Sequence, residues 1–326
     1  MKNETKTIGF PISHKENENR RALVPEDIKS IEHTENLFFE KGYGKVLNID
    51  DSEYSKLGCH IVDRDEVLKQ DIICDPKIGD ADYIEKLYNQ TIFGWVHATQ
   101  NIELTKLLKK NKITAYAWEK MYKDNRHIFW RNNELAGEAA ILHAFQLYGK
   151  MPYETTVAVI GKGNTAKGAI KILNMLGAKI EQFGRKDEAL LRKEIHNFDV
   201  IVNCVLWDVL RNDHIIYKED LLRMKRDSMI VDISCDHDGA IESSHPTTIE
   251  NPVYTKNGVL HYAVDHTPSL FYKTFTNNNS RIISKYIQML MMREENKELK
   301  DSLIIEDGII KDPEIINVQE SKIIHE

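Results

Sequence analysis

Short apolar runs alternate with amphipathic stretches along the first 130 residues of the chain. The runs that predict strands lie at 7–12, 71–74, 91–96 and 114–118. Apolar residues with helical spacing occupy 25–31, where Pro25 suits a first helical turn, and 101–110. This alternation is typical of parallel βα units and predicts one α/β domain.

A second series of apolar runs follows a helical stretch at 135–148. We expect strands there at 156–160, 179–183, 199–205, 229–234 and 260–264. Their continuous Val and Ile content indicates strands buried on both faces of a parallel sheet. A long helix is expected from residue 278, and the later segment LIIEDGIIK predicts a small hairpin around its Asp-Gly turn.

The loop after the strand at 156–160 carries the pattern Gly161-x-Gly163-x-x-Ala166, and a helix and another strand follow within about thirty residues. Gly161 permits a tight turn, Gly163 lets the backbone approach a pyrophosphate, and Ala166 keeps the helix close to the strand. The alternative is an ordinary tight βα turn. Because the full strand-helix-strand context is present, we predict a dinucleotide site. The residues assigned to the cofactor are Gly161, Lys162, Gly163, Asn164, Thr165, Ala166, Arg185, Lys186, Val205 and Leu206.

The end of the strand at 179–183 bears on the choice of cofactor. Sites that prefer NAD usually place an Asp or Glu there for the ribose 2′-hydroxyl, whereas this chain has Gly184. Arg185 and Lys186 follow, and two cations suit a 2′-phosphate. We therefore predict NADP(H). The alternative is that both cations only solvate the end of the strand.

Polar residues that follow the predicted strands are candidates for chemistry, because ligands of open α/β sheets bind beyond the carboxyl ends of the strands. They are Arg20, Lys77, His97 and Asp236. Arg can hold a carboxylate through two hydrogen bonds, and His can transfer protons near neutral pH, which suits carbonyl or imine chemistry. Each has a structural alternative. Arg20 could pair with Glu18. Lys77 could be a solvated surface lysine, His97 a packed ring and Asp236 a cap in its loop.

The acidic loop from Asp236 to Asp238 also contains His237, which raises the question of a metal site. No helical pair of histidines at i, i+4 accompanies it, so we expect no metal. The four cysteines show neither a CxxC pair nor zinc-ribbon spacing, and we interpret them as core residues.

Composition narrows the class of protein. A length of 326 residues allows about two domains. Lys and Arg number 44 and Asp and Glu number 51, so the net charge of −7 disfavours a nucleic-acid partner. The polar N-terminus lacks a secretory signal, and no apolar run is long enough to cross a bilayer. We therefore expect a cytoplasmic protein without a membrane partner.

Several segments together resemble the alanine dehydrogenase and saccharopine dehydrogenase superfamily. They are ENRRALVP at 18–25, WVHA at 95–98, ELAGEAA at 134–140, the glycine motif, VDISCDHDGAIESSHPT at 231–247 and HYAVDHTP at 261–268. Within the superfamily, ENRRALVP, FEKGYG at 39–44 and the pair Gly184-Arg185 are most similar to the carboxyethylornithine synthases, which reductively join pyruvate to the side-chain amine of ornithine with NADPH.

The resemblance implies roles for particular residues. Arg20 falls on the arginine that binds the keto-acid carboxylate, His97 on the catalytic histidine and Asp236 on an active-site aspartate. The catalytic lysine of alanine dehydrogenases, two residues before a proline, is replaced here by Cys74, whereas Lys77 follows that proline. Lys77 either reaches the same place by another loop path or has a different role.

The resemblance also implies two Rossmann-like doubly wound domains of α/β class, with the cofactor domain inserted in the substrate domain. We place the NADP-binding domain at 135–280 and the substrate domain at 1–134 plus 281–326. Relatives in the superfamily are oligomers, so we expect a homo-oligomer.

The implied reaction is an NADPH-dependent condensation of pyruvate with the side-chain amine of ornithine or lysine, with His97 or Lys77 as the base. Glu138, Asp265 and His266 are candidates for binding the ammonium of the diamino acid. Three alternatives stand: an alanine dehydrogenase that uses ammonia, a saccharopine-type enzyme that uses 2-oxoglutarate, and an NADPH-binding protein without catalysis.

Overall fold

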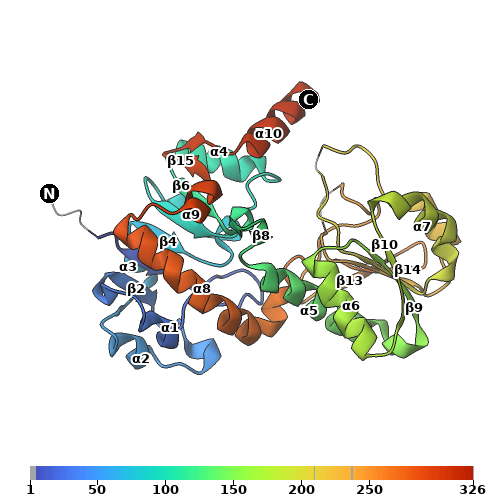
Figure 1. Ribbon diagram of the computed structural model, residues 1–326, viewed down its shortest axis with the longest axis horizontal. Helices are drawn as coiled ribbons and strands as arrows, with labels where there is room; N and C mark the ends of the chain where they lie inside the picture. Colours follow the sequence, from blue (N-terminus) through green and yellow to red (C-terminus); the bar gives the residue numbers. More distant parts are fainter. Residues whose placement is uncertain (1–4, 209, 236–237, 326) are drawn as a thin grey trace. The chain divides into compact units, whose positions relative to one another are not determined.

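The chain divides into two compact units, and the second is inserted in the first (Figure 1). The computed structural model describes residues 5–208, 210–235 and 238–325. Unit 1 comprises residues 1–129 and 272–326, and unit 2 comprises 130–271. These boundaries fall at the starts of helices α5 (Trp130–Tyr148) and α8 (Tyr272–Met292), so the boundaries expected after residues 134 and 280 lie inside helices. A helical pattern does not reveal at which residue one core ends and the next begins.

Unit 1 is built on an eight-stranded sheet. Its strands are β1 (Ile8–Phe10), β2 (Leu37–Glu40), β3 (His60–Val62), β4 (Ile72–Cys74), β5 (Thr91–Gly94), β6 (Thr114–Ala117), β15 (Leu303–Glu306) and β16 (Ile309–Ile310). The order is β16-β15-β6-β5-β4-β1-β2-β3, with β1 to β6 parallel and β15 antiparallel to β6. Because the strand order reverses between β1 and β4, their carboxyl ends flank the place where open α/β sheets bind ligands.

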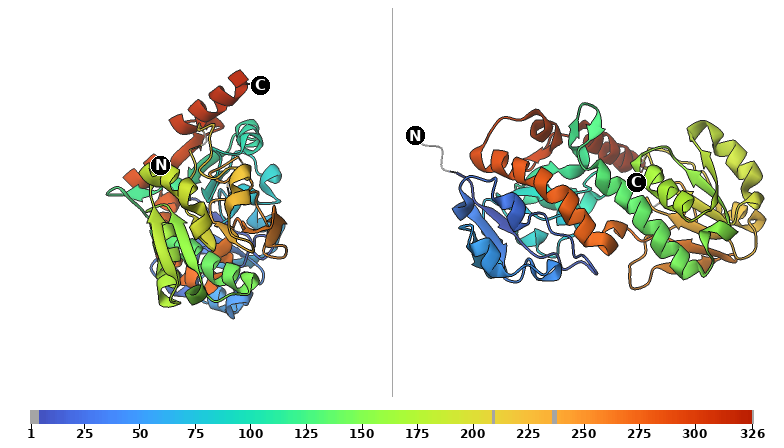
Figure 2. Two further views of the ribbon diagram at one scale, coloured as in Figure 1. Left: turned by 90° about the vertical axis from the view of Figure 1, so that its right-hand side faces the viewer. Right: turned by 60° about the horizontal axis from the view of Figure 1, so that its bottom comes forward.

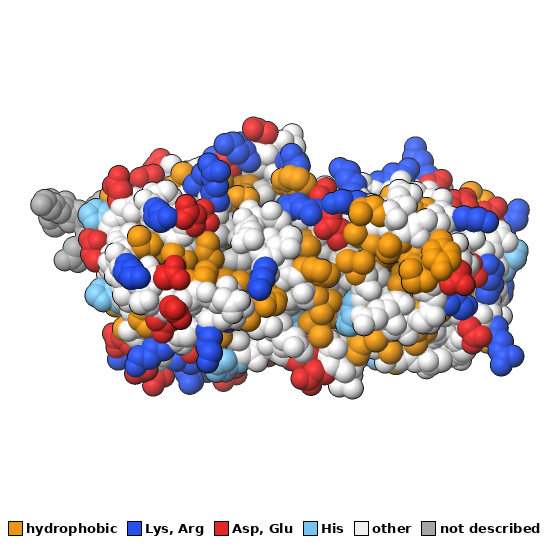
Figure 3. Space-filling view, turned by 90° about the horizontal axis from the view of Figure 1, so that it is seen from below, with side chains coloured by type: hydrophobic (Ala, Val, Ile, Leu, Met, Phe, Trp, Pro, Cys, Tyr) orange, Lys and Arg blue, Asp and Glu red, His pale blue; other side chains and the backbone are white. Residues whose placement is uncertain are grey.

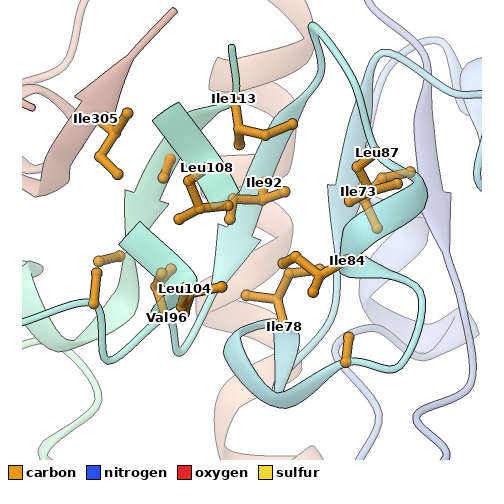
Figure 4. Close-up of a cluster of buried hydrophobic side chains, with 14 of the residues drawn as sticks. Ile73, Ile78, Ile84, Leu87, Ile92, Val96, Leu104, Leu108, Ile113 and Ile305 are labelled. Atoms are coloured by element: carbon orange, nitrogen blue, oxygen red, sulfur yellow. The ribbon is translucent and has the colours of Figure 1, made fainter. Parts of the chain in front are cut away.

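Helices and an apolar core cover this sheet. Besides α8, unit 1 contains α1 (Pro25–Ile28), α2 (Asp51–Ser55), α3 (Arg64–Val67), α4 (Ile102–Lys110), α9 (Lys297–Ser302) and α10 (Pro313–His325), together with the small ribbon of β7 (Tyr122–Lys123) and β8 (Arg126–His127). Leu104 and Leu108 of α4 join Ile73, Ile92 and Ile113 in one buried cluster (Figure 4). Burying each such side chain favours folding by about 1.5 to 3 kcal/mol. No helix in the described part of the chain is long and apolar enough to cross a membrane.

Unit 2 is built on a six-stranded sheet. Its strands are β9 (Thr156–Ile160), β10 (Lys179–Phe183), β11 (Val200–Asn203), β12 (Met229–Asp232), β13 (Val253–Lys256) and β14 (Val259–Tyr262). The order is β10-β9-β11-β12-β14-β13, and all strands except β13 are parallel. Buried clusters cover both faces, as the Val and Ile runs predict. The expected class of two Rossmann-like α/β units, one inserted in the other, is therefore confirmed.

Helix α5 lies beside α6 (Asn164–Met175) in unit 2 (Figures 1 and 2). Two glycines let the helix backbones meet: a Cβ on Gly137 would stand 2.1 Å from the carbonyl oxygen of Thr165, and a Cβ on Gly168 would stand 1.9 Å from that of Glu134. This crossing holds the first turn of α6, directly after the glycine motif, against α5.

Five strands of the described residues were not expected from the hydrophobic pattern, namely β2, β3, β13 and the two-residue strands β7 and β8. Strands β3 and β13 are edge strands whose side chains are half-buried or exposed, so their hydrophobic signal is weak. The hairpin expected around Asp307-Gly308 is confirmed by the antiparallel pairing of β15 and β16. Strand β13 pairs with β14 in the same way around Asn257-Gly258, a turn signal that the pattern analysis missed.

Candidate functional site

The first candidate group lies in the loop after β1. Arg20 is 4% exposed, and its Nε and Nη2 donate to the carboxylate of Glu18 at 2.8 and 2.5 Å. Its guanidinium carbon lies over the ring of Phe275 in α8, 5.0 Å from the ring centroid. The alternative considered for Arg20, pairing with Glu18, is thus present in the fold. Within the described part of the chain, Nη1 of Arg20 donates no hydrogen bond.

Lys77 lies in the loop after β4 and is almost fully buried. Its ammonium is 3.0 Å from the carboxylate of Asp80, which also accepts a hydrogen bond from Lys15 at 2.6 Å. Burial alone would raise the pKa of Asp80, but the two ammonium groups outweigh it and lower the pKa to about 2. Asp80 therefore stays ionised and fixes Lys77 at the end of the sheet. Cys74, the last residue of β4, is fully buried.

A second buried acid supports the same loop. Asp75 has no exposed surface, and its carboxylate accepts the backbone N–H of Lys77 at 2.8 Å and the hydroxyl of Tyr83 at 2.7 Å. Burial raises the pKa of Asp75 to about 6. Asp75 thus shapes the turn that carries Lys77.

His97 follows β5 in the left-handed backbone region, with φ of 53°. Glu119, which follows β6, holds this loop: its carboxylate accepts the N–H of His97 at 2.6 Å and the N–H of Val96 at 3.2 Å. A positive φ is uncommon for histidine, and such conformations persist where surrounding contacts determine them. The imidazole lies nearly parallel to the indole of Trp95, with centroids 6.1 Å apart. Glu119 and Trp95 together set the orientation of His97.

The loops after β4 and β5 are in backbone contact. A Cβ on Gly79 would stand 2.2 Å from the carbonyl oxygen of Val96, and a Cβ on Gly94 would stand 2.0 Å from that of Asp75. This contact brings Lys77 and His97 to the same edge of the sheet.

The surroundings of His97 lower the pKa of its imidazole, which favours the neutral form. His97 is partly exposed, but the surrounding protein removes part of the hydration of its ring, and this loss is the largest effect that lowers its pKa. The charge of Lys77 lowers the pKa further, and the carboxylate of Glu119 opposes both effects. A neutral imidazole can accept a proton, so His97 suits the role of a base.

Asp75 and Glu119 were not predicted as site residues from the sequence. Both come directly after predicted strands, the same signal that selected Lys77 and His97. In the fold, their carboxylates accept hydrogen bonds from backbone N–H groups of the loops. The sequence alone does not show which loop a given carboxylate contacts.

In unit 2 the glycine motif connects β9 to α6. Gly161 has φ of 112°, a conformation that favours glycine, and Ala166 is fully buried. A Cβ on Gly163 would meet no atom within 4 Å, so the backbone there is open to a pyrophosphate. Asn164 and Thr165 form the first turn of α6, where free N–H groups and the helix dipole attract phosphate. The residues present therefore fit a dinucleotide.

The remaining predicted cofactor residues lie beside this loop. Arg185 and Lys186 follow β10 and are exposed. Arg185 lines a cavity of about 120 Å³ together with Val205 and Leu206, which follow β11. Two residues missed by the sequence reasoning, Trp207 and Arg211, line it as well, with the guanidinium 4.2 Å from the indole centroid.

Asp236, the predicted active-site aspartate, lies outside the described residues, as does His237. The start of its loop is described. Asp232, buried at the end of β12, accepts hydrogen bonds from the side-chain amide of Asn203 at 2.9 Å and from the N–H of Cys235 at 3.0 Å. These bonds tie the ends of β11 and β12 together at the point where the loop begins.

The three candidates for the substrate ammonium lie in unit 2. Glu138 of α5 binds Arg131 at 2.8 and 3.0 Å and Lys171 of α6 at 2.9 Å, which gives it a structural role in joining the two helices. Asp265 is exposed and lies 2.5 Å from Nδ1 of His266, whose ring is buried. Of the three side chains, that of Asp265 is the most exposed, at 31%.

A larger cavity, of about 770 Å³, lies in unit 1 away from these groups. Ile72 and Thr91, the first residues of β4 and β5, line it together with residues of α8 and α9. Lys77 and His97 follow the last residues of the same two strands. The larger cavity is therefore at the opposite, amino-terminal end of these strands.

Comparison with known proteins places the chain in a family. The model of the alanine dehydrogenase/PNT N-terminal domain matches residues 9–129, and the model of the C-terminal domain matches residues 182–326. The solved structure of an L-alanine dehydrogenase is 20% identical with a TM-score of 0.79, covering 97% of this chain and 99% of that chain, which supports the fold.

Two curated relatives extend over most of the chain. An N(5)-(carboxyethyl)ornithine synthase of Clostridium botulinum is 33% identical, covering 86% of this chain and 93% of that protein. An alanine dehydrogenase of Methanococcus maripaludis is 27% identical, covering 95% of this chain and 93% of that protein. The chain therefore belongs to the alanine dehydrogenase superfamily of oxidoreductases and, within it, to the family of the N(5)-(carboxyethyl)ornithine synthases.

Proposed function

We propose that this protein catalyses the NADPH-dependent condensation of pyruvate with the side-chain amine of ornithine or lysine. The products are N5-(1-carboxyethyl)ornithine or N6-(1-carboxyethyl)lysine, NADP⁺ and water. One observation carries the proposal: a chain 33% identical to a carboxyethylornithine synthase has Arg20, Lys77 and His97 in the loops that follow β1, β4 and β5.

Arg20 binds the carboxylate of pyruvate. Its Nε and Nη2 are engaged by Glu18, and Nη1 is the donor that remains for a second carboxylate. Because Glu18 and Phe275 fix the guanidinium, little side-chain entropy is lost when pyruvate binds. Lys77, with its ammonium at the next strand end, is positioned to stabilise negative charge on the keto oxygen.

His97 takes a proton from the substrate amine. An alkylammonium has a pKa near ~10.4, so at neutral pH a base must free its lone pair before it attacks the keto carbon. The carbinolamine that forms then loses water, and His97, protonated in the first step, returns its proton to the departing hydroxyl. Asp236, outside the described residues, stays assigned as an active-site aspartate, and Asp265 is the proposed partner of the substrate ammonium.

The cofactor residues are those of unit 2. Gly161 and Gly163 make room for the pyrophosphate, the first turn of α6 supplies N–H donors, and Arg185 and Lys186 supply positive charge for a 2′-phosphate. When bound, NADPH supplies the hydride that reduces the imine to the secondary amine.

A second candidate is an alanine dehydrogenase, favoured by the relative from Methanococcus maripaludis, which matches 95% of the chain. It would use ammonia in place of the diamino acid. Cys74, in the position of the catalytic lysine, and Arg185, in the turn where NAD sites place a carboxylate, favour the first candidate.

The test is the loss of NADPH absorbance with pyruvate in the presence of ornithine, lysine or ammonia, repeated with 2-oxoglutarate and with NADH. We expect oxidation that requires pyruvate and a diamino acid, with NADH a poor substitute. Turnover with ammonia and NADH would establish the second candidate, and 2-oxoglutarate with lysine would establish a saccharopine-type enzyme. Binding of NADPH without turnover on any pair would refute a catalytic role.

We also propose that the protein is a homo-oligomer, as the superfamily resemblance implies. Met151, Tyr153 and Met175 of unit 2 are large apolar residues with roughly half or more of their surface exposed. Apolar areas also interrupt the charged surface on one face of the molecule (Figure 3). Light scattering on the purified protein should give a multiple of the 37.8 kDa chain mass, and a monomer mass would refute assembly.

A further inference from the structure

The register of β9 and β10 places the glycine motif next to the turn after β10. Ile160 and Phe183, the last residues of the two parallel strands, are direct neighbours. The N–H of Gly161 donates to the carbonyl oxygen of Phe183 at 2.9 Å, and the side-chain amide of Gln182 donates to the carbonyl oxygen of Gly161 at 2.8 Å. Lys162 and Gly184 therefore leave the sheet side by side.

The side chain of Lys162 occupies the space that a side chain at position 184 would need. Its Cε and Nζ lie 3.0 and 3.1 Å from the point where a Cβ on Gly184 would stand. Among the described residues, no ion pair engages Lys162. Any side chain at position 184 would therefore displace the ammonium group of Lys162 from its present place.

Position 184 is the place where NAD sites carry the carboxylate that binds the ribose 2′-hydroxyl. In this chain an ammonium stands there, so the charge at the site is reversed. We propose that Lys162, admitted by the absent side chain of Gly184, is the residue that selects the 2′-phosphorylated nucleotide. This inference rests on the proposed use of NADPH and identifies the side chain that decides it.

One carboxylate is close to the same point. Oδ2 of Asp187 lies 3.3 Å from the position of a Cβ on Gly184 and accepts the N–H of Gly184 at 2.8 Å. Asp187 thereby holds the turn that carries Arg185 and Lys186. Residues 185–187 and Lys162 together carry three cations and one anion, and Glu188, the next residue, is paired with Arg211 at 3.0 Å. The net positive charge favours a phosphate.

Calorimetric titration of the full-length protein with NADPH and NADH, without substrates, tests the proposal. Lys162→Met keeps the apolar stem and removes the charge, so NADPH should bind about 10- to 100-fold more weakly while NADH is unaffected. Gly184→Asp puts a carboxylate beside Lys162 and should reverse the preference toward NADH. Gly184→Ala displaces only the flexible end of Lys162 and should weaken NADPH binding without reversing the preference.

Lys167→Met is the matched control, because Lys167 is an exposed lysine of α6 that follows the glycine motif and its loss changes the net charge equally. It should leave the affinity ratio of NADPH to NADH within about twofold. Adenosine 2′,5′-bisphosphate titrated against AMP isolates the contribution of the 2′-phosphate, and unchanged thermal unfolding of each variant confirms its fold.

The outcomes separate this inference from the proposed function. If the ratio of NADPH affinity to NADH affinity falls in Lys162→Met but not in Lys167→Met, the role of Lys162 in selection is supported. A wild-type preference for NADPH that survives Lys162→Met refutes it and leaves the proposed function intact, with selection at Arg185 and Lys186. Wild-type protein that prefers NADH refutes both this inference and the proposed use of NADPH.

Discussion

At the scale of single residues, the loops after the strands of unit 1 combine candidate catalytic groups with groups that hold them. His97 stands in a left-handed conformation that the carboxylate of Glu119 supports through two backbone N–H groups. Arg20 and Lys77 are each fixed by a carboxylate, of Glu18 and Asp80 respectively. The orientation of each candidate group is therefore set before a substrate binds, which favours catalysis because less ordering remains to be done.

Replacing His97 by Ala should lower kcat by a factor of about 10² to 10⁴, because the substrate amine loses its base. The affinity for NADPH should stay the same, since the proposed cofactor residues are in unit 2. Steady-state kinetics and a separate NADPH titration measure the two quantities. His196→Ala, an exposed histidine of unit 2, is the control, and a variant at position 97 with the wild-type rate would exclude His97 from the mechanism.

Asp75 makes the stability of the fold depend on pH. Burial raises its pKa from the ordinary 3.8 to about 6 in the folded protein, so the folded state binds the proton more tightly than the unfolded state. The contribution of Asp75 to the free energy of unfolding therefore falls as the pH rises from about 4 to 6, by about 3 kcal/mol at most.

Asp75→Asn removes this titration, because the amide keeps an acceptor for Tyr83 or Lys77 but carries no charge. Urea unfolding of both proteins at pH 4.5 and pH 7.5 should show the variant gaining stability relative to wild type at the higher pH. The same stability difference at both pH values would contradict the raised pKa of Asp75.

At the scale of elements, the crossing of α5 and α6 sets the position of the glycine motif. Gly137 and Gly168 allow the two backbones to touch, and Glu138 bridges Arg131 and Lys171 across the crossing. The same arrangement places the amino end of α6 beneath the proposed pyrophosphate site.

Gly168→Ala should destabilise the protein by about 2 kcal/mol or more, although Ala favours an isolated helix by about 1 kcal/mol over Gly. The new Cβ would stand 1.9 Å from the carbonyl oxygen of Glu134, so the helices must separate. Thermal unfolding and NADPH affinity should both decline. Asn174→Ala, an exposed site on the same helix, is the control and should cause no loss; an unaltered unfolding temperature for Gly168→Ala would show that the helices adjust freely.

At the scale of the whole molecule, the proposed cofactor residues and the proposed keto-acid residues belong to different units. Residues 130–271 contain the glycine motif and the cations after β10, while Arg20, Lys77 and His97 belong to unit 1. Each unit has its own sheet and its own buried clusters.

NADPH alone should therefore slow amide hydrogen exchange in the segments 161–166 and 185–186 of unit 2, because bound ligand restricts the opening of the loops that it contacts. The peptides that contain β2 and β3, on the far side of the unit 1 sheet from β6, should exchange as before. Mass spectrometry of exchanged peptides, with and without NADPH, measures both. Protection confined to unit 1 would refute the assignment of the cofactor to unit 2.

The sequence by itself determined the features that depend on neighbouring residues. The runs at 156–160 and 179–183 are strands with the predicted limits. The first is buried and continuously apolar, as expected of an inner parallel strand, whereas the second is an edge strand that is exposed along most of its length. The hairpin at Asp307-Gly308 and the turn at Gly161 follow from backbone preferences of single residues. The same local signal is weak for the edge strands β3 and β13, which bury little surface.

Tertiary structure decided which side chains meet. In ENRRALVP the sequence does not distinguish Arg20, bound to Glu18, from Arg21, whose guanidinium donates to the carbonyl oxygen of Tyr43 at 2.6 Å. Glu119 reaches His97 because β6 pairs with β5, and Lys162 reaches Gly184 because β9 pairs with β10 in register. Residues about 20 apart in sequence come within hydrogen-bonding or van der Waals distance only through the strand order, and neither local spacing nor composition encodes that order.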